Sequence, residues 1–285
     1  MILFVNDLTV IDFSYLCHQR GAVGESWIVD LTLHGSLNEE SMVLDFALVK
    51  KQVKKIIDEH IDHKLALPMA KNVSFEQRGE QTNVTFTYAD NKRLAMSCPA
   101  QAYCPIDAVE INQQSVTDYL IKTILPLLPS NIDKIEISLR PENIDSFYYH
   151  YSHGLKKHDG NCQRIVHGHR SKIEIFENGM KSPRLQKQWS ETFKDIYLVS
   201  QEDIIAPEEL KFIESSPSHL CCAYTAPQGY FELSIEQSVT HTLPCDTTVE
   251  CIADYLASTL KSDNPNSDFK VVAYEGVAKG SIAYA

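Results

Sequence analysis

The sequence predicts an α+β fold made of two tandem copies of one unit. Near the start of the chain, two runs of alternating apolar and polar residues, typical of half-buried strands, precede an amphipathic helix. The same order of patterns returns after residue 143. A chain of 285 residues is long enough for two domains of about 140 residues each. We therefore expect one domain over residues 1–143 and a second over residues 144–285.

The first copy opens with two predicted strands, over residues 8–16 and 26–34. Residues 38–45 lead into a helix whose apolar positions recur with a helical period. These positions are Phe46, Leu48, Val49, Val53, Ile56, Ile57 and Ile61. We expect them to form the face that packs on the sheet.

The first copy continues with two shorter strands over residues 83–88 and 93–97, joined by a polar turn. Ser115 and Asp118 predict the start of a second helix, which breaks at Pro126 or Pro129. A strand over residues 134–139 completes the unit, and residues 140–143 form a linker.

The second copy repeats these patterns. Residues 149–155 and 169–177 alternate as strands, a capping box over residues 247–250 starts a helix, and residues 270–274 form the last strand.

The stretch from Tyr149 to Phe176 holds five of the eleven histidines of the chain. His167 and His169 lie two residues apart on a predicted strand, so both imidazoles point to the same face. A neighbouring strand can add His153. Three neutral imidazoles with one open position are typical of catalytic zinc. The alternatives are a histidine-rich surface hairpin, or a structural site in which Cys162 is the fourth ligand.

These residues resemble the 6-pyruvoyl-tetrahydropterin synthase / 6-carboxytetrahydropterin synthase family. Tyr149, His153 and Leu155 match the family's first strand pattern, with Tyr151 where the family has a small residue, and Cys162 and His167-Gly168-His169 match the rest. The resemblance implies two tandem tunnelling-fold (T-fold) domains, antiparallel sheets with helices on one face. It also implies zinc bound by the three histidines, and Cys162 as a catalytic acid/base.

Asp62-His63-Lys64 ends the first predicted helix and resembles the family's Asp-His motif. An aspartate beside a histidine fixes the tautomer and raises the basicity of the ring, as proton transfer needs. The alternative is a helix end, where a histidine favours the dipole. The second half offers only Ser218-His219 or Thr240-His241 as substitutes.

Glu275 follows the last predicted strand, where the family anchors the pterin ring with a glutamate. A carboxylate there can accept two hydrogen bonds from a 2-amino-pyrimidinone edge. The alternative is a solvated strand end.

Aligning the halves predicts that each kept part of one composite site. Cys17 takes the place of His153, residues 23–25 (Val-Gly-Glu) take the place of His167 to His169, and Leu139 takes the place of Glu275. We therefore expect one zinc per chain, in the second half, with Asp62 and His63 contributed by the first half.

The composition excludes some classes of protein and some cellular locations. A net charge of −12 argues against a general nucleic-acid binder. No run approaches 18 apolar residues, and the N-terminal run lacks a basic flank, so we expect no membrane span, no signal peptide and a cytoplasmic protein with reduced cysteines. Lys156, Lys157, Arg164 and Arg170 are candidates for holding a triphosphate, with solvated surface cations as the alternative.

The resemblance implies a lyase that converts 7,8-dihydroneopterin triphosphate to 6-carboxy-5,6,7,8-tetrahydropterin, with loss of triphosphate and acetaldehyde, in queuosine-type deazapurine synthesis. The alternatives are 6-pyruvoyl-tetrahydropterin synthase activity and a non-catalytic zinc- or pterin-binding protein. The family closes barrels from several domains, so we expect a homo-oligomer, with a trimer of two-domain chains favoured.

Overall fold

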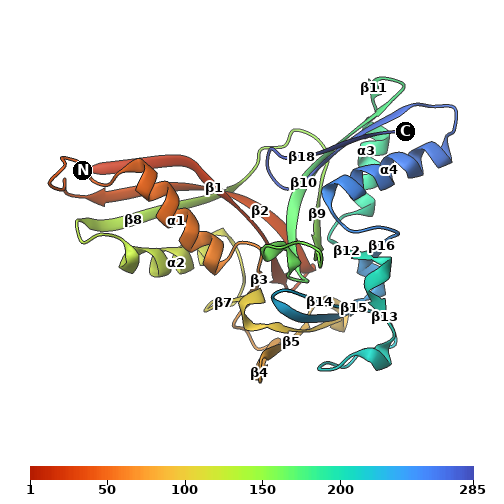
Figure 1. Cartoon of the computed structure of the whole chain (residues 1–285), viewed down its shortest axis with the longest axis horizontal. Coiled ribbons are helices and arrows are strands. Elements are labelled where there is room, and N and C mark those ends of the chain that lie inside the picture. The colour runs from red at the N-terminus through yellow and green to blue at the C-terminus, as the bar shows by residue number, and fades with distance from the viewer.

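The computed structural model describes residues 1–285, which form three sheets and four α-helices (Figure 1). The sheet of the first half has the strand order β7-β3-β1-β2-β8. Its strands are β1 (Ile2–Cys17), β2 (Gly21–Gly35), β3 (Leu65–Pro68), β7 (Tyr103–Ile106) and β8 (Ile132–Pro141). The strands β1, β2 and β8 are antiparallel, whereas the short strands β3 and β7 add parallel pairs at one edge.

Helices α1 (Phe46–His60) and α2 (Gln113–Ile124) lie together on one face of this sheet (Figure 1). Asp45 caps α1 with its carboxylate. Asn112 caps α2 in a capping box with Ser115, so α2 begins before the predicted position, because Asn112 rather than Ser115 accepts the free backbone N–H. No helix of the chain is long and apolar enough to cross a membrane.

Most of the predicted apolar positions lie in the core of the first half, but Phe46 and Leu48, in the first turn of α1, are 54% and 47% exposed. Val29, Leu31 and Leu33 of β2 are at most 1% exposed, and Val49 and Val53 of α1 are fully buried against the same cluster. Burial of one strand face and one helix stripe is what the two periodicities predicted.

The second half has a seven-stranded sheet with the order β16-β12-β9-β10-β17-β18, and β11 pairs with β10. Its strands are β9 (Tyr148–His153), β10 (His167–Glu177), β11 (Met180–Lys181), β12 (Ile196–Ser200), β16 (Thr240–Leu243), β17 (Phe269–Tyr274) and β18 (Gly280–Tyr284). Helices α3 (Pro183–Thr192) and α4 (Val249–Asp263) pack on it, and Thr248 caps α4. The two halves therefore share one plan, and the predicted tandem tunnelling fold is confirmed.

A third sheet joins the halves, in the order β13-β14-β15-β6-β5-β4. Its strands are β4 (Val73–Arg78), β5 (Gln81–Thr87), β6 (Arg93–Pro99), β13 (Ile204–Ile205), β14 (His219–Ala226) and β15 (Gly229–Glu236). Strand β6 pairs with β15, for example Leu94 with Ile235. The alternating patterns predicted β5 and β6 but not this pairing, because the partner strands are far apart along the chain.

The hairpins β1–β2 and β9–β10 cross in close contact. The hydroxyl oxygens of Ser14 and Ser152 are 2.7 Å apart. A Cβ atom added to Gly24 or Gly168 would lie 1.8 Å or 2.2 Å from the carbonyl oxygen of Tyr151. Only glycine fits at these two positions, so the crossing point sets how the halves sit against each other.

Candidate active site

Three histidines converge on one face of the β9–β10 hairpin. His153 pairs across the ladder with His167, and His169 pairs with Tyr151, so all three rings project to the same side. Their ring centroids are 4.5 to 5.8 Å apart, and each ring offers a nitrogen within 4.8 Å of the others. All three side chains are at most 1% exposed.

Each ring has one nitrogen facing a protein oxygen. Nδ1 of His153 lies 2.9 Å from the carbonyl oxygen of Thr247, and Nδ1 of His167 lies 2.9 Å from that of Arg164. Nδ1 of His169 lies 3.2 Å from Oδ1 of Asp12. A carbonyl oxygen only accepts, so Nδ1 of His153 and of His167 carries the proton, and their Nε2 lone pairs remain free.

The Nε2 atoms of all three histidines are buried without a hydrogen-bond partner, and so is Nδ1 of His169, whose contact with Asp12 is close but is not aligned as a hydrogen bond. A buried polar atom left unpaired is costly, so three such atoms at one point call for a common ligand. Imidazole nitrogens with an oxygen partner on the other ring nitrogen are the ligand arrangement of zinc and related metals. Burial lowers the pKa values of His153 and His167 well below the usual range, which keeps these rings in the neutral, metal-binding form.

The first half brings Asp62 and His63 to this cluster. His63 adopts a positive φ of 53° just before β3, and its Nδ1 lies 2.5 Å from Oδ2 of Asp62. Its ring centroid is 5.2 Å from that of His167. Cys162, in a short turn of residues 161–163, completes a second group, in which His63, Cys162 and His167 offer ligand atoms within 4.8 Å of one another.

His63 is set up to carry a proton. Burial alone would lower its pKa, but the hydrogen bonds with Asp62 and Cys162 outweigh burial and raise the pKa to about 10. The raised pKa favours the imidazolium form of His63, which has the Asp62 carboxylate on one side and Cys162 on the other.

The backbone around this pair is held from both halves. The N–H of Asp12 donates to Oδ1 of Asp62 at 2.9 Å, and the N–H of His63 donates to the carbonyl of Asp12 at 2.7 Å. Arg164, only 6% exposed, donates to the carbonyl oxygens of Asp62 and His63, each at 3.4 Å. Arg164 thus holds the backbone of Asp62 and His63, and burial lowers the pKa of its guanidinium to about 10.

The other predicted triphosphate cations also have protein partners. Lys156 pairs with Asp203 at 2.6 Å, and Lys157 pairs with Asp246 at 2.9 Å. Arg170 donates to the carbonyl of Glu142 and lies over the ring of Tyr148. A triphosphate would have to compete with these contacts.

Glu275 follows the last residue of β17. Lys279 and Asp12 connect it to the histidine cluster. Its Oε2 is 3.4 Å from Nζ of Lys279, and that Nζ is 3.2 Å from Oδ2 of Asp12. The next residue, Gly276, has a φ of 67°, and a Cβ atom there would lie 2.4 Å from Oδ1 of Asp12. The turn after β17 therefore needs glycine where it passes Asp12.

The strand registers correct two equivalences expected between the halves. Ser14 pairs with Gly24 and Ser152 with Gly168, so Tyr15, rather than Cys17, takes the place of His153. In the same way, Leu139 of β8 pairs with Val29 as Ala273 of β17 pairs with Ile173. Pro141, rather than Leu139, is therefore the first-half equivalent of Glu275. Both expectations missed by two residues because an alternating pattern looks the same after a shift of two.

The first half has no metal cluster at the equivalent place. There Tyr15, Val23 and Glu25 stand where the second half has three histidines. Burial raises the pKa of Glu25 to about 7. Asp195, whose φ of 55° and place before β12 match those of His63, receives hydrogen bonds from the guanidinium of Arg20. An Arg20–Asp195 ion pair therefore stands at this second crossing, where both residues line a cavity of about 530 Å³.

The two alternative bases lie elsewhere. His219 lies on β14, with Nδ1 2.7 Å from the hydroxyl of Ser234, and His241 lies on β16, with Nε2 3.0 Å from the hydroxyl of Tyr255. The structure brings His63, and neither of these two, to the cluster.

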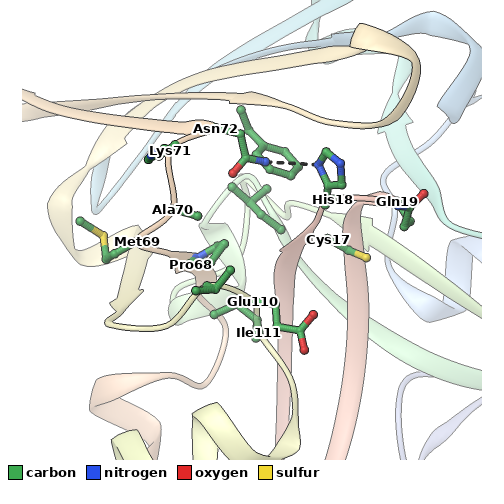
Figure 2. A pocket seen from close by; sticks show the side chains of 13 residues that line it. Cys17, His18, Gln19, Pro68, Met69, Ala70, Lys71, Asn72, Glu110 and Ile111 are labelled. Carbon is green, nitrogen blue, oxygen red and sulfur yellow. Dashed lines mark hydrogen bonds between the residues drawn. The ribbon is translucent and has the colours of Figure 1, made fainter.

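A cavity of about 730 Å³ opens where the β1–β2 hairpin meets the third sheet (Figure 2). Cys17 and His18 line it, and the amide nitrogen of Asn72 lies 3.5 Å from Nδ1 of His18. None of the clustered histidines lines this cavity. This cavity is therefore separate from the histidine cluster.

Four residues around the site were missed by reasoning from the sequence: Asp12, Arg164 in its actual role, Thr247 and Lys279. Asp12 gave a signal, since a carboxylate between Ile11 and Phe13 interrupts an apolar strand. The other three act through contacts that no local pattern reveals.

Comparisons with known proteins follow the same division of the chain. The family model described as 6-pyruvoyl tetrahydropterin synthase matches residues 18–91 and 144–278. A protein of Methanocaldococcus jannaschii named "Putative 6-carboxy-5,6,7,8-tetrahydropterin synthase" is 33% identical over 122 residues, which cover 41% of this chain and 71% of that protein.

Solved structures of 6-pyruvoyl tetrahydropterin synthases are also similar. The Plasmodium vivax enzyme is 20% identical with a TM-score of 0.40, covering 51% of this chain and 93% of that one. The Plasmodium falciparum enzyme is 22% identical with a TM-score of 0.39, covering 49% and 90%.

Proposed function

The chain belongs to the 6-pyruvoyl tetrahydropterin synthase family, and from this premise we propose that it converts 7,8-dihydroneopterin triphosphate to 6-carboxy-5,6,7,8-tetrahydropterin. Water is consumed, and triphosphate and acetaldehyde leave. The observation that supports an enzyme is the meeting of three unpaired Nε2 atoms with His63 and Cys162. The name of the archaeal relative supports this product, which belongs to queuosine-type deazapurine synthesis.

The metal in this proposal is zinc, held by His153, His167 and His169. These neutral imidazoles suit zinc, and three protein ligands leave a coordination position for substrate. When bound, zinc supplies Lewis-acid polarisation of the substrate's side-chain oxygens.

Cys162 and His63 perform the proton transfers. Elimination of triphosphate requires a proton to be taken from a neighbouring carbon of the substrate side chain, and later steps require protons to be returned. The Cys162 sulfur and the His63 ring lie side by side next to His167, so both reach the same region of the substrate. Asp62, 2.5 Å from Nδ1 of His63, orients the ring so that its other nitrogen faces this space.

Glu275 binds the pterin ring. Its carboxylate can accept two hydrogen bonds from the amino-pyrimidinone edge, and Lys279 limits how it can turn. In this assignment, the domain of residues 1–143 supplies Asp62 and His63, and the domain of residues 144–285 supplies the zinc ligands, Cys162 and Glu275. The active site is composite, with one zinc per chain.

A non-catalytic zinc- or pterin-binding protein is the second candidate, favoured by Tyr151. This residue is fully buried, with its ring centroid 5.0 Å from that of His153 and 5.3 Å from that of His169. It takes up space beside the cluster where the family pattern has a small residue.

Incubation of the zinc-loaded protein with dihydroneopterin triphosphate decides between these functions. We expect release of triphosphate and acetaldehyde in equal amounts. Trapping measures the acetaldehyde, and chromatography identifies the pterin product. Triphosphate without acetaldehyde would instead support 6-pyruvoyl-tetrahydropterin synthase activity. Zinc content without release of triphosphate would support the binding protein.

We also expect a trimer of chains. Strand β18 is a free sheet edge within one chain, and its Ile282 and Tyr284 are 52% and 72% exposed. Open edges with apolar side chains favour pairing with another copy. Light scattering at micromolar concentration should give about three times the chain mass of 32.2 kDa, and a monomer would contradict the expectation.

A further inference from the structure

We infer that Asp12, in the first half, is a positioning residue that couples the zinc ligand His169 of the second half to the catalytic pair Asp62–His63. The inference rests on the proposed function and adds to it a residue outside the family motifs. The evidence for it is that the side chain of Asp12 contacts His169, whereas its backbone contacts Asp62 and His63.

The side chain of Asp12 is only 6% exposed and faces the histidine cluster across the crossing of the hairpins. Its Oδ1 lies 3.2 Å from Nδ1 of His169 and receives a hydrogen bond of 2.5 Å from the hydroxyl of Ser26. Its Oδ2 lies 3.2 Å from Nζ of Lys279. Ser26 and Lys279 therefore hold the carboxylate so that one oxygen remains directed at His169.

His169 differs from the other two ligands in this contact. His153 and His167 face backbone carbonyls of the second half, at Thr247 and Arg164. His169 faces a carboxylate, and that carboxylate belongs to the first half. A carboxylate close to the far nitrogen favours a proton there, and so favours the metal-binding tautomer and makes the imidazole a stronger donor.

The backbone of Asp12 holds the catalytic pair at the same time. Its N–H donates to Oδ1 of Asp62, and its carbonyl accepts from the N–H of His63. The first half therefore cannot bring His63 to the cluster without also bringing the carboxylate to His169. One residue of β1 sets the distance between the proton-carrying group and the metal ligands.

A simpler role for Asp12 would be to balance the charge of Lys279. The side chain of Lys279 is 51% exposed and its Nζ also lies 3.4 Å from Oε2 of Glu275, so its ammonium group has a partner besides Asp12. The two roles can be separated, because charge balance and action through His169 predict different zinc affinities when Asp12 and Lys279 are both replaced.

The test measures zinc affinity by competition with a chelator, together with the absorption spectrum of the cobalt-substituted protein. Asp12→Asn should weaken zinc binding by about 10- to 100-fold, the size expected for loss of an outer carboxylate, and should change the cobalt spectrum. Asp30→Asn is the matched control, since Asp30 lies on β2 and pairs with Arg140. The control should keep wild-type affinity.

The double variant Asp12→Asn with Lys279→Met separates the two roles. Affinity that stays weakened supports action through His169, whereas recovery to the wild-type value overturns it in favour of charge balance. Equal affinities of Asp12→Asn and the wild type also overturn the inference, while the proposed function stands. A wild-type chain that binds no zinc overturns the proposed function itself. Thermal unfolding of the metal-free variants checks that each is folded.

Discussion

Replacing His167 with alanine should abolish zinc binding and turnover together. His167 is central to the cluster, since its ring lies between those of His153 and His63, at centroid distances of 4.5 and 5.2 Å. Two imidazoles remain after the change, too few for a protein zinc site. We expect the zinc content to fall from one per chain to near zero. Turnover should fall by about 10³-fold or more, because several kcal/mol of charge stabilisation is lost.

His158→Ala is the matched control, because His158 belongs to the same histidine-rich stretch but is exposed in the loop before Cys162. It should keep one zinc per chain and wild-type turnover. Metal analysis that finds full zinc in His167→Ala, or two zinc ions per wild-type chain, would contradict the assignment. The metal-free form of His167→Ala should unfold near the temperature of the metal-free wild type, since no partner is lost except the Arg164 carbonyl.

Replacing Asp62 with asparagine should lower turnover by about 100-fold or more and leave the zinc content unchanged. Asp62 touches no metal ligand directly. Its Oδ2 holds Nδ1 of His63, and its Oδ1 accepts from the backbone of Asp12. Asparagine keeps the shape of the side chain but loses the charge that keeps His63 protonated, so the ring no longer supplies a proton at neutral pH.

Asp58→Asn serves as the control for Asp62→Asn. Asp58 lies four residues earlier on α1 and forms an ion pair with Lys54 on the exposed face. Steady-state kinetics and metal analysis on both variants should show a large loss of turnover only for Asp62→Asn. Wild-type turnover in Asp62→Asn would show that the pair merely ends a helix, and loss of zinc in that variant would show that it supports the metal site.

The opposite surroundings of the histidines also set how the site responds to pH. The pKa of His63 is raised to about 10, so its contribution to stability is present below its unfolded value and is lost as the pH rises through about 10. The pKa values of His153 and His167 are lowered, so protonation of the unfolded rings opposes folding as the pH falls below their usual range. The ionisation of these histidines therefore stabilises the folded site least at the acidic and the strongly alkaline ends of the pH range.

The sequence by itself predicted helices α1, α2 and α4, about half of the strands, and most of the candidate site residues. A strand or helix depends on the pattern of its own side chains, so β2, α1 and the His167–His169 spacing were readable from neighbouring residues. The resemblance of residues 149–176 to a known pattern added the roles of His153 and Cys162. The tandem arrangement was visible for the same local reason, because each copy carries its own patterns.

The tertiary structure decided which of these residues meet. Ser14 and Ser152 touch although 138 residues separate them, and through this crossing His63 reaches His167 and Asp12 reaches His169. The shared third sheet and the Arg20–Asp195 pair arise in the same way. No local pattern records such contacts, because an alternating strand fits any register shifted by two residues. Close packing at Gly24 and Gly168 selects the arrangement in which residues of the two halves meet at one cluster.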